Sequence, residues 1–131
     1  MTGRAHSVLR IGKPIAHLDQ LSMIEEQWNE IYRSRSRHSL FLSFEFISMW
    51  YRSFVKPEQV RVYPVYADQT VISFFPLFFS RKGVLRILSW PIYADECMNA
   101  GLLIAEGYES LFSSRAVDSL IAGIKGWDIL H

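Results

Sequence analysis

Three residues that could carry chemistry lie together just after an apolar stretch. Asp95, Glu96 and Cys97 follow a run that ends at Trp90. Loops at the ends of strands often carry binding residues. An aspartate there could orient a substrate amine or hydroxyl, or act as a base if burial raised its pKa. The alternative is that Asp95 caps a turn by accepting backbone N–H groups, which is the commoner role of aspartate in loops.

Other catalytic and metal-binding patterns are weak. Cys97 would need a lowered pKa to act as a nucleophile, and its two acidic neighbours act in the opposite direction. The four histidines are scattered along the chain: His6, His17, His38 and His131. There is no CxxC pair and no pair of histidines at helical or turn spacing. The sequence therefore predicts neither a cysteine nucleophile nor a metal site.

Composition and charge exclude several classes of partner. The net charge of +1 in 131 residues creates no global field that would attract nucleic acid or acidic lipid. The basic run at residues 33–39, RSRSRHS, is interpreted as a solvated helix end. The sequence contains neither GxGxxG nor a P-loop. We expect no nucleic-acid partner.

The cellular location is predicted from cysteine usage and hydropathy. The single cysteine fits a reducing compartment, and the first residues form no apolar signal segment. The longest apolar run, residues 71–79, has about half the length that a membrane helix needs. We therefore expect a soluble cytoplasmic protein with no membrane span.

The first half of the chain predicts one strand and two helices. Residues 7–12 alternate as a strand does. Apolar residues at i, i+3, i+7 and i+10 predict a helix from Leu21, with Asp19 or Ser22 as its N-cap. A second helix in LSFEFISMWYRSF has Ser43 as its predicted N-cap.

The middle of the chain predicts an antiparallel meander. Residues 59–67 and 70–80 are joined by two polar residues, which indicates a hairpin, and a third strand at 84–90 follows the tripeptide RKG. Pro64 and Pro76 cannot donate to a ladder, so bulges or sheet edges are expected there. The second strand is apolar at nearly every position, which predicts that both of its faces are covered.

The last third predicts a helix and a final strand. The connection at 91–107 contains GLLI, which could form a short strand. A helix is expected at about 108–125 with Gly126 as its C′ residue, followed by a strand at 127–131. A buried strand at a chain end is uncommon, so we expect the natural protein to continue. The fold class is α/β (α+β), with a mixed, mostly antiparallel sheet flanked by helices in one domain over 1–131.

This order of elements resembles the first part of the GNAT acyltransferase fold. FLSFEFISMWYRSF is similar to the helix entry of CelD-like proteins, which are relatives of the Fem-type aminoacyltransferases. Pro76 and Leu77 match the P-L of that family's strand pair, and residues 86–90 match its next strand. Asp95 matches an aspartate that follows that strand, and GIKGWDILH resembles the W-D-x-L-x-L pattern. The resemblance extends from about Leu18 onward.

The resemblance implies acyl transfer from an acyl-thioester, such as acyl-CoA, to an amine or hydroxyl. The acceptor would be a small molecule or linked to a glycan, as in cell-envelope or polysaccharide biosynthesis. Tyr93 and Asp95 are the residues expected to contact this substrate, and no catalytic residue is assigned.

The donor site is expected to lie elsewhere. The family's phosphate-binding pattern, Arg or Gln followed by x-x-Gly-x-Gly/Ala, is not in this sequence. The resemblance therefore implies an incomplete first half of a two-part fold. This segment would bind no cofactor, and acyl-CoA would bind to a full-length protein with a second, carboxy-terminal GNAT-like half. The alternative is a non-catalytic GNAT-like module that binds a partner through a sheet edge or an apolar patch.

Overall fold

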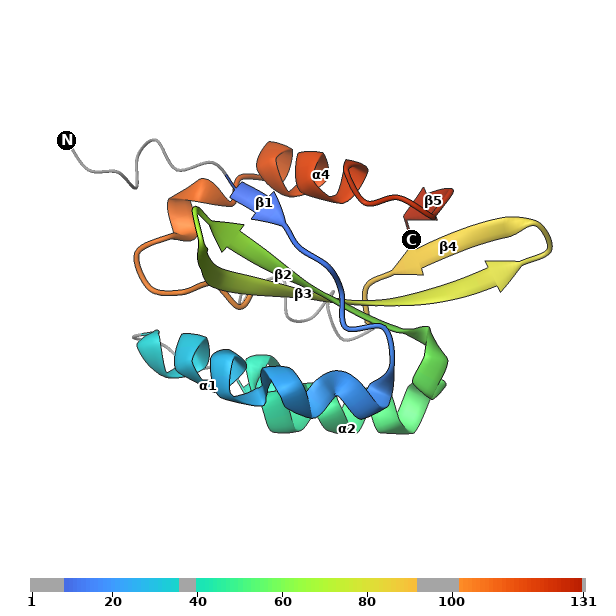
Figure 1. The fold of residues 1–131 in the computed structure, drawn as a ribbon, viewed down its shortest axis with the longest axis horizontal. Helices are drawn as coiled ribbons and strands as arrows, with labels where there is room; N and C mark the ends of the chain where they lie inside the picture. Colours follow the sequence, from blue (N-terminus) through green and yellow to red (C-terminus); the bar gives the residue numbers. More distant parts are fainter. Residues whose placement is uncertain (1–8, 36–39, 92–101, 131) are drawn as a thin grey trace.

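The computed structural model describes residues 9–35, 40–91 and 102–130 as a mixed α/β structure. The strands are β1 (Leu9–Ile11), β2 (Val60–Ala67), β3 (Thr70–Lys82), β4 (Leu85–Ser89) and β5 (Ile129–Leu130). The described α-helices are α1 (Glu25–Ser34), α2 (Phe44–Phe54) and α4 (Ser114–Ala122). The strands form one sheet in the order β1-β2-β3-β4-β5, and only β5 is parallel to its neighbour. The expected mostly antiparallel sheet flanked by helices is confirmed, with α1 and α2 on one face and α4 on the other (Figure 1).

Two apolar cores follow from the alternation of β2 and β3 side chains. Phe74 belongs to the core beneath α1 and α2, and Phe75 belongs to the core beneath α4. The first core also buries the predicted helix face: Leu21, Ile24, Trp28 and Ile31. The second core contains Tyr63, Val65, Leu77, Leu88, Ile121 and Ile124. The prediction that both faces of this apolar strand are covered is therefore confirmed.

Helix α2 begins as predicted. Ser43 has extended backbone angles, and its Oγ accepts the N–H of Phe46 at 3.2 Å. Glu45 lies in the first turn, where the helix dipole favours an acid. The helix ends at Phe54, and Pro57 starts a separate 3-10 turn.

The predicted start of the first helix is wrong. A 3-10 helix, Leu18–Ile24, precedes α1. Its N-cap is His17, whose Nδ1 accepts the N–H of Asp19 at 3.1 Å. Ser22 lies inside the 3-10 helix, where its carbonyl accepts the N–H of Glu25. An imidazole nitrogen thus replaces the expected serine or aspartate oxygen, and the cap lies earlier in the chain.

Neither proline lies at a bulge, but Pro76 lies at a local sheet edge, as the alternative prediction had it, because no described strand pairs with the outer side of β3 there. Pro64 and Pro76 pair in register within the β2–β3 ladder, and the register shifts between Val65 and Tyr66. Both prolines are tolerated because of the direction in which their nitrogens point.

Hydrogen bonds to β2 establish those directions. Val62 exchanges both backbone bonds with Ile15, so Pro64, two residues later, faces the same side of β2. There its carbonyl accepts the N–H of Gly12 at 2.8 Å. Pro76 lies opposite Val62, so its nitrogen points away from β2. Neither proline therefore removes a bond between β2 and β3.

The β3–β4 hairpin turns later than predicted. Lys82 still pairs with Leu85, and the turn consists of Gly83 and Val84. The φ of Gly83 is +63°, as required at the first central position of a type II′ turn. Figure 1 shows this hairpin, in yellow, extending beyond the helices.

The predicted third helix is shorter than expected. Residues Glu109–Leu111 form a 3-10 turn, and α4 covers only Ser114–Ala122. The N–H of Gly123 closes the helix by bonding to carbonyls of the last turn. Gly126, the predicted C′ residue, instead has a φ of +96° in the loop that leads to β5. The predicted final strand is confirmed at Ile129–Leu130.

Candidate functional site

The residues predicted to contact substrate lie outside the described part of the chain. This holds for Tyr93 and Asp95, and also for Glu96 and Cys97. The structure does describe both ends of the connection that carries them. These ends are the end of β4 and the segment 102–105, which we call the return segment.

The outgoing end of the connection is packed. Ser89 and Pro91 are buried, and the ring of Trp90 lies 5.5 Å from that of Phe75. Trp90 also packs against the core beneath α4. The connection therefore leaves from a fixed position on the sheet.

The return segment is bound to β3. Ile104 forms an isolated antiparallel bridge with Ser73, and the N–H of Ala105 donates to the carbonyl of Ile72 at 2.8 Å. The buried hydroxyl of Ser73 donates to the carbonyl of Leu103 at 2.6 Å. The strand considered possible at GLLI is thus reduced to a single bridge.

Arg35 holds the return segment from the other side. Its Nη1 donates to the carbonyls of Leu102 and Ile104 at 3.2 and 2.8 Å. Nearby, the Oγ of Ser34 accepts the N–H of Glu106 at 3.2 Å. The interpretation of the basic run as a solvated helix end is therefore wrong for Arg35, which satisfies backbone carbonyls. Residues 36–39 of that run lie outside the described residues.

The two ends of the connection lie beside β3, one on each side of the interval between Ser73 and Phe78. Strand β4 pairs with β3 from Phe78 onward, and the return segment pairs at Ser73. Within the described ranges, no strand pairs with this side of β3 between those positions. Pro76, which has no N–H to donate, lies in this interval. The connection that carries Tyr93 and Asp95 thus begins and ends beside the same interval.

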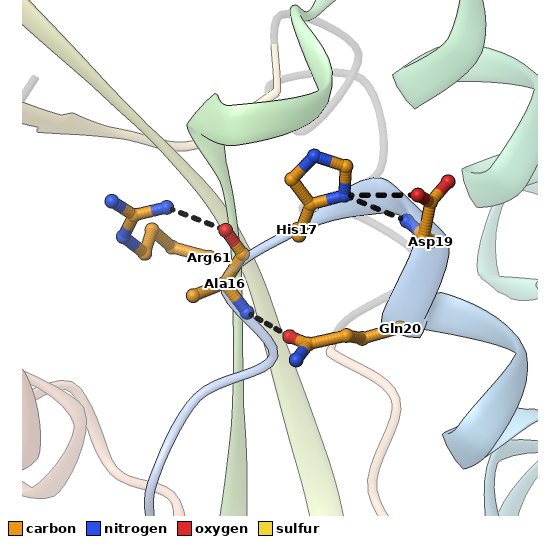
Figure 2. A network of polar contacts seen from close by, with 5 residues as sticks. All are labelled: Ala16, His17, Asp19, Gln20 and Arg61. Atoms are coloured by element: carbon orange, nitrogen blue, oxygen red, sulfur yellow. Dashed lines mark hydrogen bonds and ion pairs between the residues drawn. The ribbon is translucent and has the colours of Figure 1, made fainter.

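A second polar group surrounds the start of the 3-10 helix (Figure 2). Arg61 donates to the carbonyl of Ala16 at 3.1 Å, and the N–H of Ala16 donates to Gln20 Oε1 at 3.1 Å. His17 Nδ1 accepts a backbone N–H and lies 3.7 Å from a carboxylate oxygen of Asp19. An acid–base pair would need Nδ1 to donate to that carboxylate. We interpret this group as structural, because each bond fixes the helix start.

An arginine-rich surface extends along the β3–β4 hairpin toward its turn. The guanidinium carbons of Arg61 and Arg81 lie 5.2 and 5.7 Å from the centre of the Phe79 ring. Arg86 is directly opposite Arg81 across the two strands. Like charges in this arrangement repel. We refer to Arg61, Phe79, Arg81 and Arg86 as the arginine surface.

Asp128 offsets part of this repulsion. Its Oδ1 accepts from Arg86 Nη2 at 3.0 Å, and its Oδ2 accepts from Arg86 Nε at 3.2 Å and from the Arg86 backbone N–H at 2.8 Å. The side-chain bonds from Arg86, followed by the backbone bond, lower the pKa of Asp128 to about 2. The same carboxylate raises the pKa of Arg86. Because Asp128 immediately precedes β5, this pair ties β5 to β4.

Acidification tests this pair. The folded pKa of Asp128, about 2, lies below its ordinary value of 3.8, so its contribution to stability is complete above that ordinary value. The contribution is lost as the pH falls toward 2. The free energy of unfolding in urea should therefore be higher for wild type than for Asp128→Asn at pH 6, and only a small part of that difference should remain at pH 2. Asp118→Asn, an exposed position on α4, is the control. A difference that stays constant across this range would contradict the assignment.

The described residues hold no metal cluster and no membrane helix. Within the ranges that the structure covers, no three His, Cys, Asp or Glu side chains gather closely enough to hold a metal ion. No helix in this part of the chain combines the length and hydropathy needed to cross a bilayer.

Comparisons with protein families, curated proteins and solved structures found no match to this chain.

Proposed function

We propose that the chain is the amino-terminal half of a CelD-like acyltransferase of the GNAT superfamily. The reaction is transfer of an acyl group from an acyl-thioester, such as acyl-CoA, to an amine or hydroxyl. The acceptor is a small or glycan-linked molecule of cell-envelope or polysaccharide biosynthesis. The proposal comes from the sequence resemblance, which includes the Ser43-capped helix, the Pro76–Leu77 strand and the W-D-x-L pattern at Trp127.

One structural observation supports the proposal most. The connection with Tyr93 and Asp95 leaves the end of β4 and returns beside Ser73. Both ends are held by buried contacts, so the intervening residues start and finish at fixed places on the sheet. Loops positioned in this way by a rigid scaffold commonly carry binding residues.

The proposal assigns the acyl donor to a second, carboxy-terminal half. The sequence contains no glycine-rich phosphate loop, so this segment supplies part of the acceptor site and binds no donor alone. The proposal also places the protein in the cytoplasm, in agreement with its single cysteine.

Substitution of Asp95 tests the site within the protein encoded by the complete reading frame. Asp95→Asn should lower acyl transfer without lowering the melting temperature, because it removes a charge that would orient the acceptor. Asp118→Asn, on exposed α4, is the matched control and should leave transfer unchanged. Thiol release from acyl-CoA measures the reaction. Full activity in a folded Asp95→Asn variant would remove Asp95 from the site.

An interaction module is the second candidate function, and exposed apolar residues favour it. Leu40, Met49 and Phe54 are 69%, 51% and 72% exposed. Exposed apolar side chains on or near one helix can contribute to a protein interface. An interaction module would bind a protein partner and show no acyl transfer even when encoded in full, whereas the acyltransferase would show turnover.

A further inference from the structure

We propose that the arginine surface binds a phosphate group of a small ligand or a lipid headgroup. This inference does not depend on acyl transfer. It follows from three observations: the strand register, the charge balance and the shared aromatic ring.

The strand register brings the side chains of this surface together. Phe75, Leu77, Phe79 and Arg81 alternate along β3, so they share one face. The first two lie in the core beneath α4, whereas Phe79 is half-buried and Arg81 is exposed. Arg86, opposite Arg81, extends the same face onto β4. The surface therefore continues the α4 side of the sheet beyond the apolar core.

The charges on this surface are unbalanced. Three guanidinium groups are present, and Asp128 is the only carboxylate that forms an ion pair with one of them among the described residues. Asp128 forms its ion pair with Arg86 and also interacts electrostatically with Arg81, so one carboxylate faces three guanidinium groups in that part of the chain. The positive charge that remains after Asp128 is counted complements a phosphomonoester, which carries about −1.5 to −2 at pH 7.

The charge of the surface suits a phosphomonoester better than a singly charged carboxylate, although the donor fork of arginine binds both. Arginine presents a planar fork of donors that matches phosphate oxygens in a bidentate arrangement. Phe79 contacts both guanidinium groups and limits their motion. Arg61 is fixed further, since its Nη1 donates to the carbonyls of Ala16, Glu58 and Val60. Because backbone carbonyls occupy Nη1 of Arg61, this residue contributes an ordered positive charge, and the exposed Arg81 supplies the donor fork.

The test is a titration with methyl phosphate at pH 7.5 and constant ionic strength, followed by amide chemical shifts of β3 and β4. We expect saturable shifts, and Arg81→Gln should weaken binding about tenfold or more. Lys82→Gln is the matched control, because it removes the same charge from the next residue, on the opposite face. It should change the affinity less than about twofold. Arg81→Lys should lie between wild type and Arg81→Gln.

A second arm distinguishes the source of the phosphate. Sedimentation with vesicles containing phosphatidic acid is compared with sedimentation with pure phosphatidylcholine vesicles. Arg81-dependent binding to methyl phosphate indicates a small ligand, and Arg81-dependent binding only to the acidic vesicles indicates a lipid headgroup. The proposal is overturned if neither probe binds, or if Arg81→Gln and Lys82→Gln weaken binding equally. Thermal unfolding confirms that each variant is folded.

Discussion

Replacing Trp28 with alanine is expected to destabilise the protein by about 3–5 kcal/mol. Trp28 is 2% exposed and lies between α1 and the sheet. Its ring stacks on Phe74 at 5.3 Å and meets the edge of Phe44 at 6.1 Å. Its Nε1 donates to the buried carbonyl of Leu42 at 2.9 Å. The substitution creates a cavity and also leaves that carbonyl unsatisfied.

Urea unfolding measures this effect, and two further variants make the result specific. Trp28→Phe keeps an aromatic ring and should recover part of the lost free energy of unfolding, through packing. The recovery should be incomplete, because phenylalanine cannot donate the hydrogen bond. Met23→Ala, at a residue that is 74% exposed, should change the free energy of unfolding by no more than about 0.5 kcal/mol. If Trp28→Ala cost no more than Met23→Ala, the packing of α1 on β3 would be wrong.

Replacing Phe75 with alanine is expected to cost about 3–5 kcal/mol through the opposite core. Phe75 is fully buried, and its ring lies 5.5 Å from Trp90 and 6.3 Å from Phe112. Its loss removes the main aromatic contact between the sheet and the segment that leads into α4. Amide exchange should therefore increase in α4 more than in α2.

This second prediction has two controls, a substitution at an exposed residue and the exchange of the helix on the opposite face of the sheet. Val84→Ala removes a side chain that is 90% exposed at the hairpin turn and should be close to neutral in urea unfolding. Faster exchange in α2 alone after Phe75→Ala would mean that Phe75 faces the other core.

Local chemistry accounts for the parts of the fold that the sequence predicted. Ser43 caps α2 because its hydroxyl is placed to accept an amide of the first turn, a rule that needs no tertiary contact. The β2–β3 hairpin follows from a short polar link between β-rich runs, and the β3–β4 hairpin follows from a two-residue turn that begins with glycine. The α+β class follows from local signals of this kind, and it can therefore be predicted from the sequence alone.

Features that depend on tertiary contacts were not predicted. His17 caps the helix two residues before Asp19, and Arg61 on β2 binds the carbonyl of the preceding residue, Ala16. The helix that was expected to extend to Lys125 ends at Ala122, where Gly123 closes it. Neither proline causes a bulge, because its nitrogen points away from the β2–β3 ladder and need not donate a hydrogen bond to it. Hydrophobic periodicity alone does not reveal that direction.

The arginine surface was also missed, although part of its signal is present in the sequence. Phe79 and Arg81 alternate onto one face, and Arg86 follows a two-residue turn, so a fixed register would have paired Arg81 with Arg86. The sequence predicts a turn at the tripeptide RKG, which includes Arg81, and therefore does not predict the pairing of Arg81 with Arg86. Arg61 could not be added from sequence, since its approach to Phe79 depends on how β2 aligns with β3.

Thiol release from acyl-CoA, measured for residues 1–131 and for the polypeptide encoded by the complete reading frame, tests the proposed acyltransferase most directly. The proposal predicts release by the longer polypeptide with an amine or hydroxyl acceptor, no release by residues 1–131 alone, and no saturable acyl-CoA binding by residues 1–131 that carry Arg81→Gln. Thiol release by residues 1–131 alone, saturable acyl-CoA binding that persists in Arg81→Gln, or a reading frame that stops at His131 would contradict it.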